Sequence, residues 1–229
     1  PYTATYTGIT VLVPTWAREG GTSKFLNRIK DPIKKAKIKK EIVFNIVNDR
    51  GGGDLRRVQF GLVKWNRKLE GKTLHDWAIM KGLKPTPENG AELVMEAIQN
   101  GGASCIYHVL SDEDVERIMK HPQTMTGSDG RLTEPGSGHP HPRWYGAFPR
   151  VLGHYVREKG VLKLEDAIRK MTSLPAARVG LKQRGEIKPG YYADLVVFDP
   201  EKIIDKATFT EPHQYPEGIH YVFINGTLA

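Results

Sequence analysis

The stretch Thr124-Met125-Thr126-Gly127-Ser128-Asp129-Gly130, followed by HPHPRWYGAFPR at residues 139–150, decides the interpretation of this chain. A short β-prone segment, residues 124–126, ends in a glycine-rich turn with one carboxylate, and a basic, aromatic loop follows. In barrel enzymes the reacting side chains lie where strands end and loops begin, because the strand fixes them while the loop closes over substrate. Asp129 is therefore a candidate catalytic base, although Gly-Ser-Asp-Gly also suits an ordinary surface turn.

The residues before this corner alternate between predicted strands and helices, as an α/β fold requires. Cys105 lies in a predicted buried strand, residues 103–107. Ser111 then caps a helix that is expected to stop at His121-Pro122. Strand, helix and strand in this order place Asp129 at the carboxyl end of the last strand.

Capping residues mark three further helices. Asp31 fits the N-cap position before Pro32, with Ile29, Ile33 and Ala36 as the expected apolar stripe. The other two helices are expected to start after Thr73 and after Thr86, and to end near the glycines at 82 and at 101–102.

The last third of the chain changes from helices to strands. Residues 163–171 and 174–178 predict two helices, and Pro189-Gly190 suits a type II turn. Residues 193–199 are the clearest predicted strand. Residues 220–224 read as another strand that runs into Asn225-Gly226, a signal for a type I′ hairpin. Both chain ends look cut, so a fragment of something longer is expected, truncated at the C-terminus.

Composition excludes several classes of function. The formal net charge of +8 would suit a protein that binds nucleic acid. No aromatic residues interleave with the lysines at 30–40, however, as a base-stacking surface requires. No apolar run approaches the ~20 residues that span a bilayer. The single cysteine excludes an internal disulfide framework and suits a reducing cytoplasm. We expect a cytoplasmic protein that binds neither nucleic acid nor membrane.

Several long motifs in one order carry a family resemblance. They are PYTATYTG, MTGSDG, HPHPRWYGAFPRVLGHYVRE, MTSLPAARVGLKQRGEIKPGYYADLVVFDPE and HQYPEGIHYVFINGT. With these motifs the chain resembles the N-acyl-D-amino-acid deacylases (D-aminoacylases) of the amidohydrolase superfamily. The resemblance implies zinc-dependent hydrolysis of the amide of an N-acyl-D-amino acid, and it identifies the chain as the C-terminal half of such an enzyme.

The resemblance also implies a division of the chain. Residues 1–19 would hold a barrel strand and active-site loop, residues 20–100 an inserted helical lid, residues 101–183 the C-terminal barrel strands with the catalytic loop, and residues 184–229 part of a small β-sandwich domain. The implied fold is α/β, a partial (β/α)8 TIM-type barrel. Within the lid, the glycines at 51–53 suit a hinge or turn, because no Gly-Lys-Ser/Thr follows them as a phosphate loop requires.

Two residues match family positions with a function, and a third lies in a segment with one. Asp129 matches the aspartate that deprotonates the zinc-bound water and then protonates the leaving amine. Arg143 matches the arginine that holds the substrate's α-carboxylate. Tyr2 falls in a segment that lines the substrate pocket. Tyr6-Thr7 stands where the family pattern usually has Ser-Thr, so the acyl or side-chain pocket would differ.

The zinc ligands of the family lie upstream of the motif that opens this chain, so no metal ligand is assigned to it. His139 and His141 are alternatives, because alternate residues of an extended chain point to one side. Two other functions remain open. The chain could be a non-catalytic half-barrel remnant or partner-binding module, or an amidohydrolase acting on dipeptides or cyclic amides. Association through exposed barrel edges is also expected.

Overall fold

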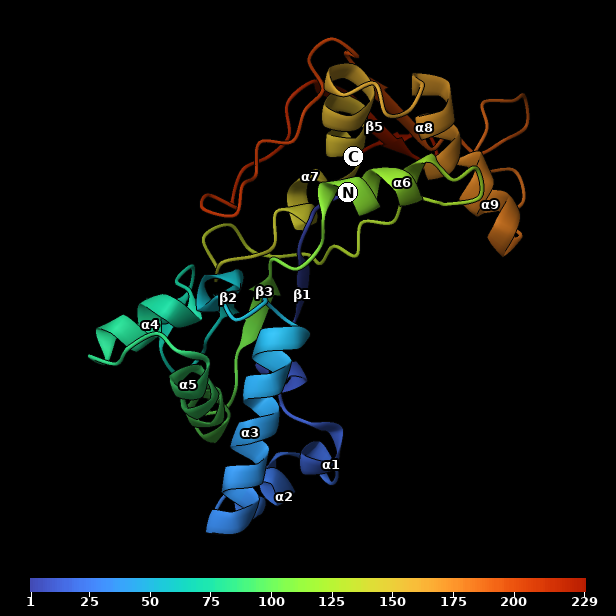
Figure 1. Cartoon of the computed structure of the whole chain (residues 1–229). Coiled ribbons are helices and arrows are strands. Elements are labelled where there is room, and N and C mark those ends of the chain that lie inside the picture. The colour runs from blue at the N-terminus through green and yellow to red at the C-terminus, as the bar shows by residue number, and fades with distance from the viewer. The chain divides into compact units, whose positions relative to one another are not determined.

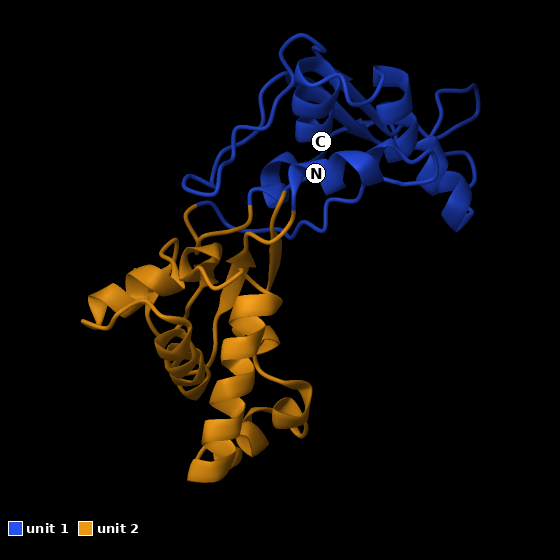
Figure 2. Ribbon diagram, viewed as in Figure 1, with its two compact units in different colours: residues 1–2, 111–135, 142–229 blue, residues 3–110, 136–141 orange.

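The computed structural model describes all 229 residues, which form two compact units. Unit 1 comprises residues 1–2, 111–135 and 142–229, and unit 2 comprises residues 3–110 and 136–141 (Figure 2). The chain is α/β, as predicted, but it forms no barrel. Each unit instead holds one three-stranded antiparallel sheet.

Unit 2 packs helices around a sheet with the strand order β1-β3-β2 (Figure 1). Its strands are β1 (Thr5–Gly8), β2 (Val58–Leu62) and β3 (Ser104–Tyr107), and its helices are α1 (Thr15–Arg18), α2 (Gly21–Arg28), α3 (Pro32–Asn48), α4 (Leu74–Met80) and α5 (Pro87–Gln99). Short 3-10 helices span Ile9–Leu12, Leu55–Arg57 and Arg67–Leu69. Cys105 is fully buried in β3, which confirms the predicted strand. Its ladder partners are Thr7 on β1 and Phe60 on β2.

The helix starts of unit 2 follow the predicted caps. The Asp31 carboxylate accepts from two backbone N–H groups at the start of α3. Thr73 and Asp76 form a complete capping box on α4, and Thr86 caps α5. Such caps satisfy N–H groups that have no partner within the helix. Between helix and sheet, Gly52 and Gly53 adopt positive φ angles, which fits the predicted turn.

The apolar stripe predicted at the start of α3 is wrong for two of its three residues; only Ile29, which precedes the helix, is buried in the core. Ile33 is 83% exposed and Ala36 is also exposed. The buried face is Ile38, Ile42 and Ile46, spaced four residues apart and packed in the core that includes α5. In the first turn of α3, Ile33 therefore meets solvent rather than core.

Unit 1 combines helices with the second sheet, in the order β4-β5-β6. Its elements are α6 (Asp112–Lys120), α7 (Arg143–Arg150), a π-helix (Val151–Glu158), α8 (Leu164–Met171), α9 (Ser173–Val179), β4 (Leu195–Phe198), β5 (Ile219–Ile224) and β6 (Thr227–Leu228). Asn225 and Gly226 have φ angles of 52° and 82°, which confirms the predicted hairpin turn. Gly190 has a φ of 82°, as a type II turn needs.

The segment from Arg143 to Glu158 is helical. The sequence predicted a basic, aromatic loop over residues 139–150, so the prediction is wrong from Arg143 onward. Pro142 already has helical dihedrals at the helix start. Pro149 lies inside α7 and lacks an N–H donor, and the helix continues beyond it in π geometry. No helix of the structure is both long and apolar enough to span a membrane.

Candidate functional site

Asp129 lies in an irregular segment and not at the end of a strand. Residues 124–126, predicted as a strand, pair with no other strand. Asp129 has a φ of 44°, in the left-handed region that non-glycine residues adopt infrequently. Its carboxylate is 84% exposed. The candidate base is therefore open to water and to a ligand.

Lys170 ties the segment before Asp129 to helix α8. Its ammonium group, almost fully buried, donates to the backbone oxygens of His121 and Thr124, the latter at 3.1 Å. In return, the backbone N–H of Thr126 donates to the Lys170 backbone oxygen at 3.1 Å. Burial lowers the pKa of Lys170. These bonds replace the strand ladder that the sequence predicted, and no local sequence signal identifies a lysine for this role.

Arg143 is paired directly with Asp129. Its Nη2 lies 2.5 Å from Oδ2 of Asp129, and its Nε donates to the Asp129 backbone oxygen at 3.1 Å. The Arg143 side chain is only 13% exposed, so the surrounding protein fixes the guanidinium while the carboxylate stays open. The structure thus brings together two of the three residues that the resemblance selected.

Tyr2 belongs to the same unit, but its polar atom is already engaged. The side chain is buried, and its hydroxyl donates to Oδ2 of Asp205 at 2.8 Å. Burial, followed by the Asp205 carboxylate, raises the pKa of Tyr2 well above its ordinary value. The phenol therefore remains a neutral donor at any physiological pH. Sequence analysis did not single out Asp205, which lies 203 positions away along the chain.

His139 and His141 make structural contacts within unit 2. The His139 ring nitrogen Nε2 lies 3.3 Å from Nε2 of Gln59, and its backbone N–H donates to Gly61 at 2.7 Å. The fully buried His141 places Nε2 3.1 Å from the Ala4 backbone oxygen. These contacts anchor residues 136–141 on the sheet of unit 2.

No three His, Cys, Asp or Glu side chains converge anywhere in the 229 residues as a metal ligand set would. A catalytic zinc needs three protein ligands in tetrahedral arrangement with an open position. The residues present do not by themselves fit a zinc ion.

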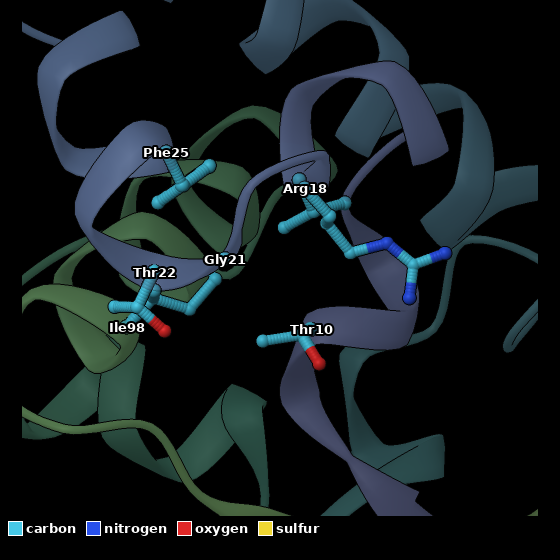
Figure 3. A pocket seen from close by; sticks show the side chains of 7 residues that line it. Thr10, Arg18, Gly21, Thr22, Phe25 and Ile98 are labelled. Atoms are coloured by element: carbon cyan, nitrogen blue, oxygen red, sulfur yellow. The ribbon is translucent and has the colours of Figure 1, made fainter.

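Two pockets of the surface are lined by other residues. A pocket of about 200 Å³ in unit 2 combines apolar and hydroxyl side chains (Figure 3). Its lining residues are Thr10, Val13, Arg18, Gly21, Thr22, Phe25 and Ile98. A larger hollow of about 580 Å³ in unit 1 lies along α8, α9 and β4. Neither is lined by Asp129, Arg143 or Tyr2. Ligand pockets are usually 300–1,000 Å³, so only the hollow in unit 1 has the volume of one.

The pair of Asp129 and Arg143 can perform two chemical tasks. An exposed carboxylate can accept a proton from water and return it to a leaving group. A guanidinium fork can hold a carboxylate through two parallel hydrogen bonds. Since Asp129 already occupies one side of the fork, an incoming carboxylate would compete with it for Arg143.

Comparison with known proteins found one family model and several relatives. The model of the family described as "Amidohydrolase family" matches residues 54–229. The D-aminoacylase of Alcaligenes xylosoxydans xylosoxydans is 45% identical over 170 residues, which cover 69% of this chain and 34% of that protein. The N-acyl-D-aspartate deacylase of the same organism is 51% identical over 124 residues, which cover 54% of this chain and 24% of that protein.

A solved structure is similar as well. The N-acyl-D-glutamate deacylase from Bordetella bronchiseptica was crystallised with zinc and a phosphonate inhibitor that mimics the tetrahedral intermediate of its reaction. It matches with a TM-score of 0.66 and 37% identity, over 76% of this chain and 34% of that chain. The chain thus spans about a quarter to a third of the length of these relatives.

Proposed function

This chain belongs to the amidohydrolase family, and from that premise we propose that it forms part of an enzyme that hydrolyses N-acyl-D-amino acids to a D-amino acid and a carboxylate. The names of the relatives support this substrate class, because they comprise a D-aminoacylase and deacylases of N-acyl-D-aspartate and N-acyl-D-glutamate. The observation that carries the proposal is the contact of Asp129 with Arg143, since it unites a proton acceptor with a carboxylate clamp.

Each of the three residues has one proposed role. Arg143 binds the substrate's α-carboxylate through its guanidinium fork, and Asp129 is released as that carboxylate takes its place. The freed Asp129 accepts a proton from the attacking water and then delivers it to the leaving nitrogen, so atoms and charge balance over the two steps. Tyr2 contributes the wall of the substrate pocket beside the helix that begins with Arg143.

Zinc is the proposed cofactor, and its ligands are proposed to lie outside these 229 residues. Support comes from the zinc in the similar deacylase structure and from the absence of a ligand set among the residues described here. When bound, zinc supplies Lewis-acid activation of water and of the amide carbonyl. No residue of this chain is assigned to the metal.

The architecture of the whole protein is a proposal of the same kind. We place residues 1–19 and 101–183 in a (β/α)8 barrel, residues 20–100 in an inserted lid, and residues 184–229 in a small β-domain. Exposed apolar side chains on the second sheet, among them Val196, Tyr221 and Ile224, support an association of this sheet with another surface.

Two other functions are less well supported. A non-catalytic partner-binding module does not require a carboxylate and a guanidinium in contact at an exposed position. Hydrolysis of cyclic amides does not require a carboxylate clamp, because a cyclic amide substrate need not carry a free α-carboxylate. Dipeptides do carry a free carboxylate. Only a comparison of turnover on both substrates can therefore distinguish a dipeptidase from an N-acyl-amino-acid deacylase.

The test uses the full-length protein that contains this chain, loaded with zinc. Amine release would be measured on N-acetyl-D-methionine, N-acetyl-L-methionine, a D-dipeptide and a cyclic amide. We expect turnover of the N-acetyl-D substrate at least ~100-fold above that of its L enantiomer, because a clamp and a base at fixed positions discriminate between configurations. Preference for the L enantiomer, for the dipeptide or for the cyclic amide would overturn the proposal.

A further inference from the structure

A buried network in unit 1 surrounds Tyr2. Besides accepting from the Tyr2 hydroxyl, Oδ2 of Asp205 lies 3.2 Å from Nη1 of Arg150. The Asp205 side chain is only 4% exposed and that of Arg150 only 25%. One carboxylate oxygen therefore receives both a phenol and a guanidinium, away from water.

Arg150 contacts each of the first two residues, and Tyr155 adds a third contact. Its Nε donates to the Pro1 backbone oxygen at 2.9 Å, and its guanidinium carbon lies 4.7 Å from the centre of the Tyr2 ring. The Tyr155 hydroxyl donates to the same Pro1 oxygen at 3.1 Å. Although burial lowers the pKa of Arg150, Asp205 together with the Tyr155 and Tyr2 phenols outweighs it and raises the pKa above its ordinary value, so the cation persists.

Helix α7 approaches this network through a glycine. A Cβ atom at Gly146 would lie 2.4 Å from Cβ of Asp205 and 2.8 Å from the Tyr2 hydroxyl oxygen, distances that no real Cβ tolerates. Gly146 lies three residues after Arg143, and Arg150 is the last residue of α7. The helix that begins with the clamp thus packs directly on Tyr2 and Asp205.

We propose that Asp205 and Arg150 are positioning residues that lock Tyr2 and the helix of Arg143 into one arrangement and so set the affinity for the substrate carboxylate. The proposal rests on the function proposed above. Neither residue needs to touch substrate. A buried ion pair suits this task, because removing one partner leaves an uncompensated buried charge. The remaining charged side chain would then move to find a new partner, and the groups that it positions would move with it.

The main variant is Asp205→Asn in the full-length zinc enzyme. An amide keeps the volume and an oxygen for the Tyr2 hydroxyl but removes the charge opposite Arg150. Glu201→Gln, a change of the same type at an exposed residue of the same segment, is the control. Kinetics on an N-acyl-D-amino acid and on its α-carboxamide separate clamping from general damage. Zinc content and thermal unfolding would be measured for each variant.

For Asp205→Asn we expect KM of the acid to rise about tenfold or more, kcat to fall much less, and the preference for acid over carboxamide to shrink. Arg150→Lys, which keeps a cation, should retain more of this preference than Arg150→Met. Glu201→Gln should match the wild type. If Asp205→Asn does not fold, Tyr2→Phe removes only the hydroxyl bond to Asp205 and should reduce the same preference.

Two failures are distinguishable. A wild-type protein that does not hydrolyse N-acyl-D-amino acids refutes the proposed function and this inference together. A wild type that does so, with variants that lose thermal stability but keep the KM and the acid preference, refutes the inference alone. In that case the network would serve only the fold.

Discussion

Asp129 and Arg143 form an ion pair, with Oδ2 and Nη2 2.5 Å apart, in which the carboxylate is 84% exposed and the guanidinium 13%. A second bond joins Nε of Arg143 to the Asp129 backbone oxygen. The asymmetry matters, because the buried partner is fixed and the exposed partner can leave. An anionic ligand that binds Arg143 must therefore displace the Asp129 carboxylate.

The pair should contribute little to stability. Exposed ion pairs typically contribute about 0.2–1 kcal/mol, because water screens the charges and the side chains lose freedom. Asp129→Asn in the 229-residue chain should therefore change the free energy of unfolding by no more than about 1 kcal/mol. Urea denaturation followed by circular dichroism measures this change. A loss of several kcal/mol would mean that Asp129 serves the fold, and any loss of activity would then be ambiguous.

The corrected face of α3 predicts a contrast between two isoleucines. Ile42→Ala removes a fully buried side chain from the core of unit 2 and should cost about 2–5 kcal/mol of unfolding free energy. Ile33→Ala, the matched control, changes a side chain that is 83% exposed and should stay within about 0.5 kcal/mol. Denaturant unfolding of both variants checks this. Equal costs would contradict the assignment of Ile42 to the core and of Ile33 to the surface.

The capping box of α4 predicts a dependence on pH. Burial raises the pKa of Asp76, but hydrogen bonds from the Thr73 backbone and hydroxyl, together with the neighbouring His75, outweigh it, so the net pKa is lowered. The folded pKa lies below the unfolded one, so Asp76 stabilises the fold above the ordinary aspartate pKa of ~3.9 and loses this effect as the pH falls through the folded value.

Asp76→Asn should accordingly cost roughly 1 kcal/mol at pH 7 and progressively less towards pH 2. Thermal unfolding of wild type and variant across that range gives the difference in Tm at each pH. A difference that stays constant down to pH 2 would show that the carboxylate charge is irrelevant to this cap.

The caps were predictable from sequence because they are local. Asp31, Thr73 and Ser111 each bond to N–H groups two or three residues further along, and the short patterns that encode such bonds are visible in the chain. The Asn225-Gly226 hairpin follows the same logic, since both residues must adopt positive φ.

What the sequence could not predict depends on distant partners. Residues 124–126 have the composition of a strand but find no neighbouring strand, and Lys170 binds their segment instead. The exposed end of α3 reflects where the core stops, which its own periodicity does not encode. Asp205 meets Tyr2 from 203 positions away, so only the fold reveals it. The residue roles at Asp129, Arg143 and Tyr2 came from the family resemblance and stay predictions.

The metal prediction concerns this chain alone. Because no three ligating side chains converge in it, the 229-residue chain should retain no stoichiometric zinc after dialysis and should release no amine from N-acetyl-D-methionine. Elemental analysis and an amine-release assay measure both, with the full-length protein as the positive control. Zinc at one equivalent together with turnover would contradict the assignment of the ligands to other segments.

The central claim, a base and a clamp at Asp129 and Arg143, is tested most directly by steady-state kinetics of Asp129→Asn and Arg143→Lys in the full-length zinc enzyme. The substrates are an N-acyl-D-amino acid and its α-carboxamide. Loss of a positioned base should lower kcat of Asp129→Asn by about 10²–10⁴-fold on both substrates, with zinc content little changed. KM of the acid should not rise, because an uncharged amide competes less well than a carboxylate for Arg143. Loss of the fork should raise KM of Arg143→Lys mainly for the acid. Near-normal kcat in Asp129→Asn, or equal damage to acid and carboxamide in Arg143→Lys, would contradict the account.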